Sequence, residues 1–100
     1  MHAEIYTVNR RAVVKLLLKT GKVNVNARDT FGRTLLYCAA VNGHEAVVKL
    51  LLETGNVNVN ARDTFGQSPF FYAELYRHDE VVKLLLETGK VNVDARDSIG

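Results

Sequence analysis

The stretch DTFGRTLLYCAAVNGHEAVVKLLLETGNVNVNAR, Asp29 to Arg62, decides the fold, because the chain on both sides of it largely repeats the same sequence. The segment VVKLLL begins at Val13, Val47 and Val81, 34 residues apart each time. A fixed period of this length predicts a repeat protein, in which small units stack because none can bury its apolar face alone. Corresponding residues of neighbouring units should then lie about 8–10 Å apart.

The composition is that of one folded domain. Of the 100 residues, 47% are hydrophobic and 24% are charged, which argues against disorder. No apolar run approaches the roughly 20 residues that cross a bilayer, and no signal peptide opens the chain. We therefore expect an intracellular protein, cytoplasmic or nuclear, that has no membrane contact.

The net charge of +2 is unevenly distributed. Residues 1–28 carry six basic residues and one acidic residue, whereas residues 29–100 carry seven basic and ten acidic residues. The basic end could steer an acidic partner. Lysine-rich helix faces are more often simply solvated surface, so both interpretations stay open.

Each unit contains the signals of two short helices. Thr34 can cap a helix that Asn42-Gly43 ends, and a second helix should run from about Glu45 to Glu53 before Gly55. The apolar residues expected to pack in the first helix are Leu35, Leu36, Cys38, Ala39 and Ala40. Cys38 is the only cysteine, which excludes a disulfide within the chain, and we expect it to be a small buried core residue.

The segment between helix pairs is rich in Asn, Asp and Gly. Residues 56–66, NVNVNARDTFG, predict an extended or hairpin-like loop with a turn at Asp63–Gly66. The VNVN alternation alone predicts a strand. A single short hairpin is only marginally stable, so these loops should lean on one another.

The pattern D-x-x-G-x-T-x-L-x-x-A-A-x-x-G-H-x-x-V-V-x-L-L-L-x-x-G, followed by V-N-A, resembles the ankyrin repeat family. The resemblance implies an all-α, ankyrin-like α-solenoid of stacked helix–turn–helix repeats with short β-hairpin loops. The chain would be a single domain over residues 1–100, with a partial repeat at 1–28, a full repeat at 29–62, a full divergent repeat at 63–96 and the start of a fourth hairpin at 97–100. The matching residues are Asp29, Gly32, Thr34, Leu36, Ala39, Ala40, Gly43, His44, Val47, Val48, Leu50, Leu51, Leu52, Gly55, Val59, Asn60 and Ala61.

The third unit departs from the pattern. Arg77 stands where the second unit has the helix-breaking Gly43, and Glu74 stands where it has Ala40. Either the turn at Arg77 is strained, or the two helices fuse into one from about Pro69 to Glu87. Fusion would allow exchange of elements between chains and a swapped dimer.

Neither end of the chain shows the polar outer face of a terminal capping repeat. The alternative function is therefore an excised or engineered repeat fragment whose main interaction is self-association, through end-to-end stacking or a swapped dimer.

Three sets of titratable residues recur at corresponding positions of the units and could have a chemical role. His44 and His78 correspond to each other, but a spacing of about 8–10 Å is too wide for two ligands of one zinc ion. His2 has no evident partner. Asp29, Asp63 and Asp97 each open a D-x-x-G turn, which favours a turn-forming role. Arg28, Arg62 and Arg96 precede them and are either exposed surface or partner contacts.

Motifs of catalysis, phosphate binding and metal binding are missing from the sequence. The basic end also lacks the interleaved aromatic residues of a nucleic-acid surface. We expect no enzyme activity, cofactor, metal or nucleic-acid partner.

The ankyrin resemblance implies noncatalytic recognition of a protein partner in a concave groove of hairpin tips and first helices. Phe31 and Phe65 are the most informative positions, because a turn tip does not need an aromatic residue. By position the groove comprises Arg28, Thr30, Phe31, Arg33, Val41, Asn42, Arg62, Thr64, Phe65, Gln67, Leu75 and Tyr76, with Thr7 and Val8 from the first unit.

Five of the eight aromatic residues lie between Phe65 and Tyr76. They either fill a core that has lost its small residues or form a contact patch. We expect Phe70 and Tyr72 in the core and Tyr76 in contact with a partner.

Overall fold

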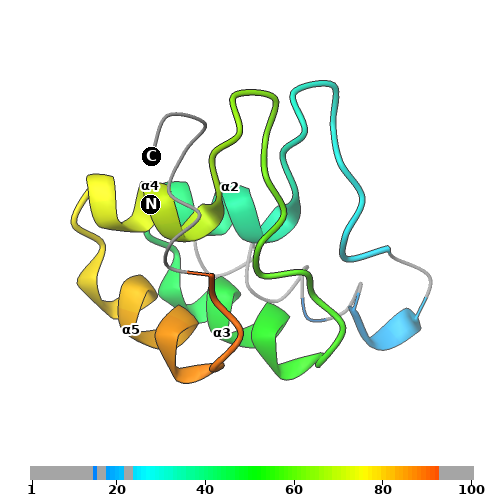
Figure 1. Ribbon diagram of the computed structural model, residues 1–100. Helices are drawn as coiled ribbons and strands as arrows, with labels where there is room; N and C mark the ends of the chain where they lie inside the picture. The colour runs from blue at the N-terminus through cyan, green and yellow to red at the C-terminus, as the bar shows by residue number, and fades with distance from the viewer. Residues whose placement is uncertain (1–14, 16–17, 22–23, 93–100) are drawn as a thin grey trace, which may run out of the picture.

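The computed structural model describes residues 15, 18–21 and 24–92 of the chain and confirms an all-α solenoid. Two helix pairs stack side by side, so that the first helices form one layer, the second helices form another, and the long loops project from the first layer (Figure 1). Residues 18–20 are also helical. The complete helices are α2 (Leu35–Val41), α3 (Glu45–Glu53), α4 (Pro69–Leu75) and α5 (Asp79–Glu87).

The first helices begin at hydroxyl caps, as expected. The Thr34 hydroxyl accepts a hydrogen bond from the backbone N–H of Tyr37 (3.1 Å), and the Ser68 hydroxyl accepts one from Phe71 (3.2 Å). Pro69 occupies the first turn of α4, where its missing N–H costs nothing. Sequence-local chemistry therefore sets where α2 and α4 start.

The packing face of α2 is narrower than the sequence suggests. Leu36, Ala39 and Ala40 are buried, at the i, i+3, i+4 spacing of a single helix face. Leu35 and Cys38 were also expected to pack, but both are exposed, because they lie outside that face. The prediction that Cys38 is a buried core residue is thus wrong.

The second helices form the centre of the core. In α3, Val48 and Leu51 are fully buried, and in α5 Val81 and Leu85 are too. Leu85 is the counterpart of Leu51, whereas Val81 is the counterpart of the partly buried Val47. Both helices end in a threonine whose hydroxyl donates to a carbonyl three residues earlier, at 2.7 Å. The core cluster is completed by Leu36, Ala39, Ala40, Val59, Phe70 and Ala73.

Arg77 adopts the left-handed conformation, with φ at 58°, so α4 and α5 do not fuse. Its N–H donates to the Glu74 carbonyl, as the N–H of Gly43 donates to Ala40 in the preceding pair. Packing of both helices onto the stack therefore holds a turn that costs about 1–2 kcal/mol in backbone conformation. The alternative of a single helix over 69–87 is wrong, and with it the proposed basis for a swapped dimer.

The loops between helix pairs are fingers without β-ladders. We call residues 27–33 the first finger and residues 61–67 the second finger. No residue of the described ranges is in a strand, so the strand expected from VNVN is wrong.

In the segments before the fingers, asparagine side chains accept hydrogen bonds from backbone N–H groups. The N–H of Asn26 donates to Asn24 Oδ1, and the N–H of Asn60 donates to Asn58 Oδ1.

In each loop, one asparagine side chain connects that loop to the next one along the stack. The Asn26 side chain donates to the Asn56 carbonyl (2.9 Å) and accepts from the Asn58 N–H (2.7 Å). Asn60 makes the same pair of bonds with Lys90 and Asn92 (both 2.9 Å). The loops therefore support one another, as their small size requires.

Several sequence predictions lie outside the described residues. They concern His2, Thr7, Val8, Arg96 and Asp97, most of the partial repeat at 1–28, and the residues 97–100. Among the described residues, no helix has the length and apolar character needed to cross a membrane.

Candidate functional site

An aspartate at the base of each finger shapes its turn. Asp29 Oδ1 accepts from the backbone N–H groups of Phe31 and Arg33, both at 2.9 Å. Asp63 Oδ1 accepts in the same way from Phe65 and Gln67, also at 2.9 Å. The turn-forming role expected for these two aspartates is confirmed, and it fixes a phenylalanine at each tip.

The two fingers lie directly against each other. The Thr64 N–H donates to the Phe31 carbonyl at 3.0 Å, and Arg28 Nη1 donates to the Arg62 carbonyl, also at 3.0 Å. A Cβ at Gly32 would lie 3.1 Å from the Asp63 Cα, so glycine permits this approach as well as the turn, whose φ is 75°. Arg28 thus links two fingers, a structural role that the sequence did not indicate.

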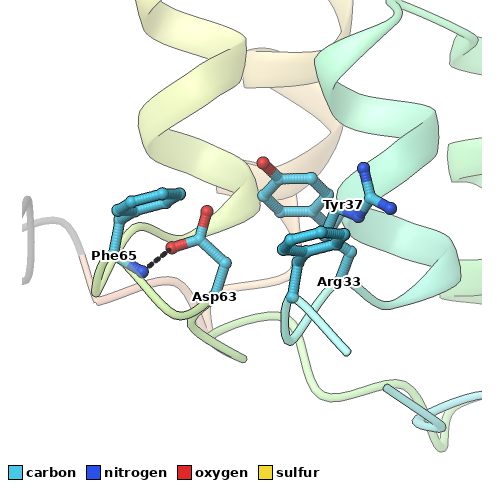
Figure 2. A pocket seen from close by; sticks show the side chains of 5 residues that line it. Arg33, Tyr37, Asp63 and Phe65 are labelled. Carbon is cyan, nitrogen blue, oxygen red and sulfur yellow. Dashed lines mark hydrogen bonds between the residues drawn. The ribbon is translucent and has the colours of Figure 1, made fainter. Parts of the chain in front are cut away.

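A pocket of about 180 Å³ lies between the fingers and the start of α2. In Figure 2, Phe65 and Asp63 of the second finger lie on one side of it, and Arg33 and Tyr37 on the other. The fifth lining residue is Phe31. The tip rings are strongly exposed, Phe31 at 55% and Phe65 at 72%, and so the pocket opens among aromatic surfaces that the core does not use.

Arg33 gives the first finger an internal cation. Its Nε donates to Asp29 Oδ2 at 2.6 Å, and its guanidinium carbon lies 4.9 Å from the centre of the Phe31 ring. The pKa of Asp29 is lowered, first by the backbone N–H of Arg33 and then by its side chain, while the same ion pair raises the pKa of Arg33. Within the first finger, Asp29 and Arg33 therefore neutralise each other.

In the second finger, the aspartate accepts its side-chain hydrogen bond from an uncharged group. Asp63 is only 8% exposed, and its Oδ2 accepts from the Tyr72 hydroxyl at 2.9 Å. Burial, assisted by Tyr37 and Asp63, raises the pKa of Tyr72 well above its ordinary value. Tyr72 is therefore a neutral hydrogen-bond donor at physiological pH. Within the part of the chain that the structure describes, Asp63 forms no ion pair.

Tyr37 joins the two units through its ring. Its ring packs edge-to-face on Tyr72, with centroids 5.1 Å apart and an interplanar angle of 79°. Burial is also the main cause of the raised pKa of Tyr37. The pocket wall is thus held by one aromatic residue from each first helix.

The residues predicted for the groove separate into four groups. Phe31, Arg33 and Phe65 line the pocket, whereas Gln67 is half-buried at the base of the second finger. Exposed finger positions are Arg28, Thr30, Arg62 and Thr64. The remaining four, Val41, Asn42, Leu75 and Tyr76, lie at the other ends of α2 and α4, away from the fingers.

Two pocket residues, Tyr37 and Asp63, were missed as site residues. Asp63 was assigned only to its turn. Tyr37 follows the Thr34 cap by three residues, so it lies on the first turn of α2 nearest the finger. The three-residue spacing from Thr34 could therefore have identified Tyr37 as a site residue.

The third unit's aromatic residues have mixed roles. Phe70 is buried at 8% exposure, as predicted for the core. Tyr72 is only half-buried and points its hydroxyl at Asp63, so its assignment to the core is wrong. Tyr76 is 52% exposed and stacks on Tyr72 with centroids 6.2 Å apart.

The histidine and cysteine side chains of the described residues form no metal centre. His78 Nε2 lies 3.0 Å from the Val41 carbonyl, which ties the start of α5 to the end of α2. No group of three potential metal ligands occurs among residues 15, 18–21 and 24–92. Cys38 is exposed as a residue, but its thiol is partly shielded from solvent, which raises the pKa of that thiol and disfavours the reactive thiolate.

The chain matches the family model for ankyrin repeats in three copies, over residues 1–97. It therefore belongs to the ankyrin repeat family. Ankyrin repeats generally mediate protein–protein interactions and are typically noncatalytic. Comparison with curated proteins finds no significant match.

Proposed function

We propose that this chain recognises a protein partner, without catalysis, through the surface formed by its two fingers and the adjoining turns of α2 and α4. The observation that carries this proposal is the pair of exposed rings at the finger tips, Phe31 and Phe65. Exposed aromatic residues are costly on a free surface and are enriched at the centres of interfaces.

The fingers also support the proposal by their rigidity. Each tip is held by two backbone hydrogen bonds to one carboxylate oxygen, and the tips are joined by the bond from Thr64 to Phe31. A surface that is already ordered loses less conformational entropy when it binds. The fingers thus present their rings in a nearly fixed arrangement.

Affinity capture tests the proposal. The variant with Phe31, Phe65 and Arg62 all changed to Ala should lose the captured partner while keeping the circular dichroism spectrum of the folded chain. Leu86→Ala is the matched control, because Leu86 is 48% exposed but lies on α5, away from the fingers. Equal capture by both variants would show that the fingers are not the binding surface.

Self-association is a second candidate, favoured by one observation. Leu52 of α3 is half-buried and packs against the core, whereas the corresponding Leu86 of α5 is 48% exposed. Leu86→Lys should then lower the mass measured by light scattering at high concentration. A wild-type chain that is strictly monomeric under those conditions would contradict this candidate.

A further inference from the structure

We propose that the pocket between the fingers binds one arginine side chain of the partner, with its guanidinium on the Phe65 ring and beside the Asp63 carboxylate. This inference rests on the proposed function and adds the chemistry of the residue that is recognised. It is carried by a difference between the two fingers.

The first finger contains a built example of the interaction. Arg33 lies over the Phe31 ring and donates to Asp29, so ring, carboxylate and guanidinium form one set. Cation–π contact and a charge-assisted hydrogen bond both favour this arrangement. The geometry of a D-x-F turn therefore allows a guanidinium to lie over the phenylalanine ring and beside the aspartate.

The second finger has the ring and the carboxylate but not the cation. Phe65 and Asp63 correspond to Phe31 and Asp29, and Gln67 stands where Arg33 would be. Phe65 is also the more exposed of the two tip residues, at 72% against 55%. Within the described part of the chain, Gln67 Oε1 is moreover a buried acceptor without a hydrogen-bond donor.

The charged side chains that line the pocket are Arg33 and Asp63. Arg33 is neutralised by its ion pair with Asp29, and Asp63 receives only neutral donors from Tyr72 and the backbone. Arg28 and Arg62 also belong to the fingers but do not line the pocket, so Asp63 is the one charged lining residue without an ion pair among the described residues. Because Asp63 is nine-tenths buried, its charge is only weakly screened by solvent.

The size and shape of the pocket fit a single side chain. Its volume of about 180 Å³ is below the ~300–1,000 Å³ of pockets that enclose whole small molecules. A planar guanidinium can lie flat on a ring while its edge donates to a carboxylate, which the ammonium of lysine cannot do. Arginine is therefore the side chain that the site favours.

Titration of the isotope-labelled full chain with Nα-acetyl-arginine methylamide, followed by amide NMR, tests the inference. We expect saturable shifts of the Phe65 and Gln67 amides, and binding at least about tenfold weaker for the citrulline analogue, which has the same shape without the charge. Equal responses to the two probes, or to the matching lysine compound and the arginine compound, would overturn the assignment to arginine.

Two variants locate the binding. Gln67→Arg gives the second finger its own cation, which should occupy the site and weaken arginine binding about tenfold. Phe65→Leu keeps an exposed apolar tip but removes the ring, and it should weaken binding to a similar extent. Wild-type binding by either folded variant would overturn the proposal. A negative result here leaves the affinity-capture test unaffected, so the two proposals fail separately.

Discussion

Gly43 and Arg77 occupy the same position in two turns of nearly equal geometry, with φ at 69° and 58°. Both turns carry the same backbone hydrogen bonds, to Ala40 and Ala39 in one and to Glu74 and Ala73 in the other. They differ in what packs against them. A Cβ at Gly43 would lie 2.7 Å from the His78 ring, whereas the turn at Arg77 accommodates a long side chain that is exposed.

The difference shows that one glycine meets two requirements. Gly43 supplies the left-handed conformation and also leaves room for the next unit's histidine. At Arg77, within the described chain, only the left-handed conformation is required. The cost of a non-glycine residue at this place therefore depends on the neighbouring unit as well as on the backbone.

Gly43→Ala should give the largest effect. The methyl group would be strained in the left-handed turn and would displace His78 from the Val41 carbonyl, so the free energy of unfolding should fall by about 2–3 kcal/mol. Unfolding in urea measures this change in the free energy of unfolding. The control Arg77→Ala keeps a Cβ at the same φ and should change stability by less than about 0.5 kcal/mol. Equal effects would mean that His78 packing does not matter.

Asn60→Asp tests whether the asparagine bridges hold the loops. The carboxylate can still accept from the Asn92 N–H but cannot donate to the Lys90 carbonyl, so we expect a loss of about 1 kcal/mol. Asn58→Asp is the control, because Asn58 Oδ1 acts only as an acceptor, from the Asn60 N–H. A variant at 60 that unfolds at the wild-type urea concentration would show that the bridge is dispensable.

Arg77→Gly should stabilise the chain. Relief of the left-handed strain is partly offset by the greater entropy of glycine in the unfolded state, which leaves a gain of about 0.5–1 kcal/mol. The unfolding midpoint in urea should rise accordingly. A fall would indicate that the Arg77 side chain contributes more than its backbone strain costs.

Arg33→Gln makes the first finger resemble the second and tests the electrostatic contrast between them. The pKa of Asp29 should rise part of the way towards its ordinary value of ~3.9, because the side-chain donor is lost while the backbone N–H at position 33 remains. Since a lowered pKa contributes its full stabilisation above this value, the contribution is lost progressively as the pH falls below ~4 towards the lowered pKa. Carboxyl carbon NMR follows the titration, and an unchanged pKa would contradict the ion pair.

Much of the fold could be predicted from local signals. Thr34 and Asn42-Gly43 bound α2 as expected, and α3 runs over the predicted residues. These signals act within a few residues, so a single sequence contains them. The exposure of Cys38 was harder to predict, because every residue of α2 is apolar or aromatic and only the packing shows which face is buried.

The site was only partly predictable, for a similar reason. The tip positions of Phe31 and Phe65 follow from the turns, but the roles of Tyr37 and Asp63 arise from contact between two units. The sequence also did not decide the backbone conformation of Arg77, because a single helix over 69–87 would satisfy the backbone hydrogen bonds equally well. Only packing against the neighbouring helix pair decides between the two.

Photocrosslinking tests the central claim, partner recognition by the fingers, most directly. Photoreactive p-benzoylphenylalanine is placed at Phe65 in one protein and at Leu86 in another, since both positions are exposed and lie on different surfaces. We predict that the probe at 65 crosslinks to a different protein and the probe at 86 does not. Crosslinking to that protein from 86 alone, or only to a second copy of this chain from either position, would contradict the account.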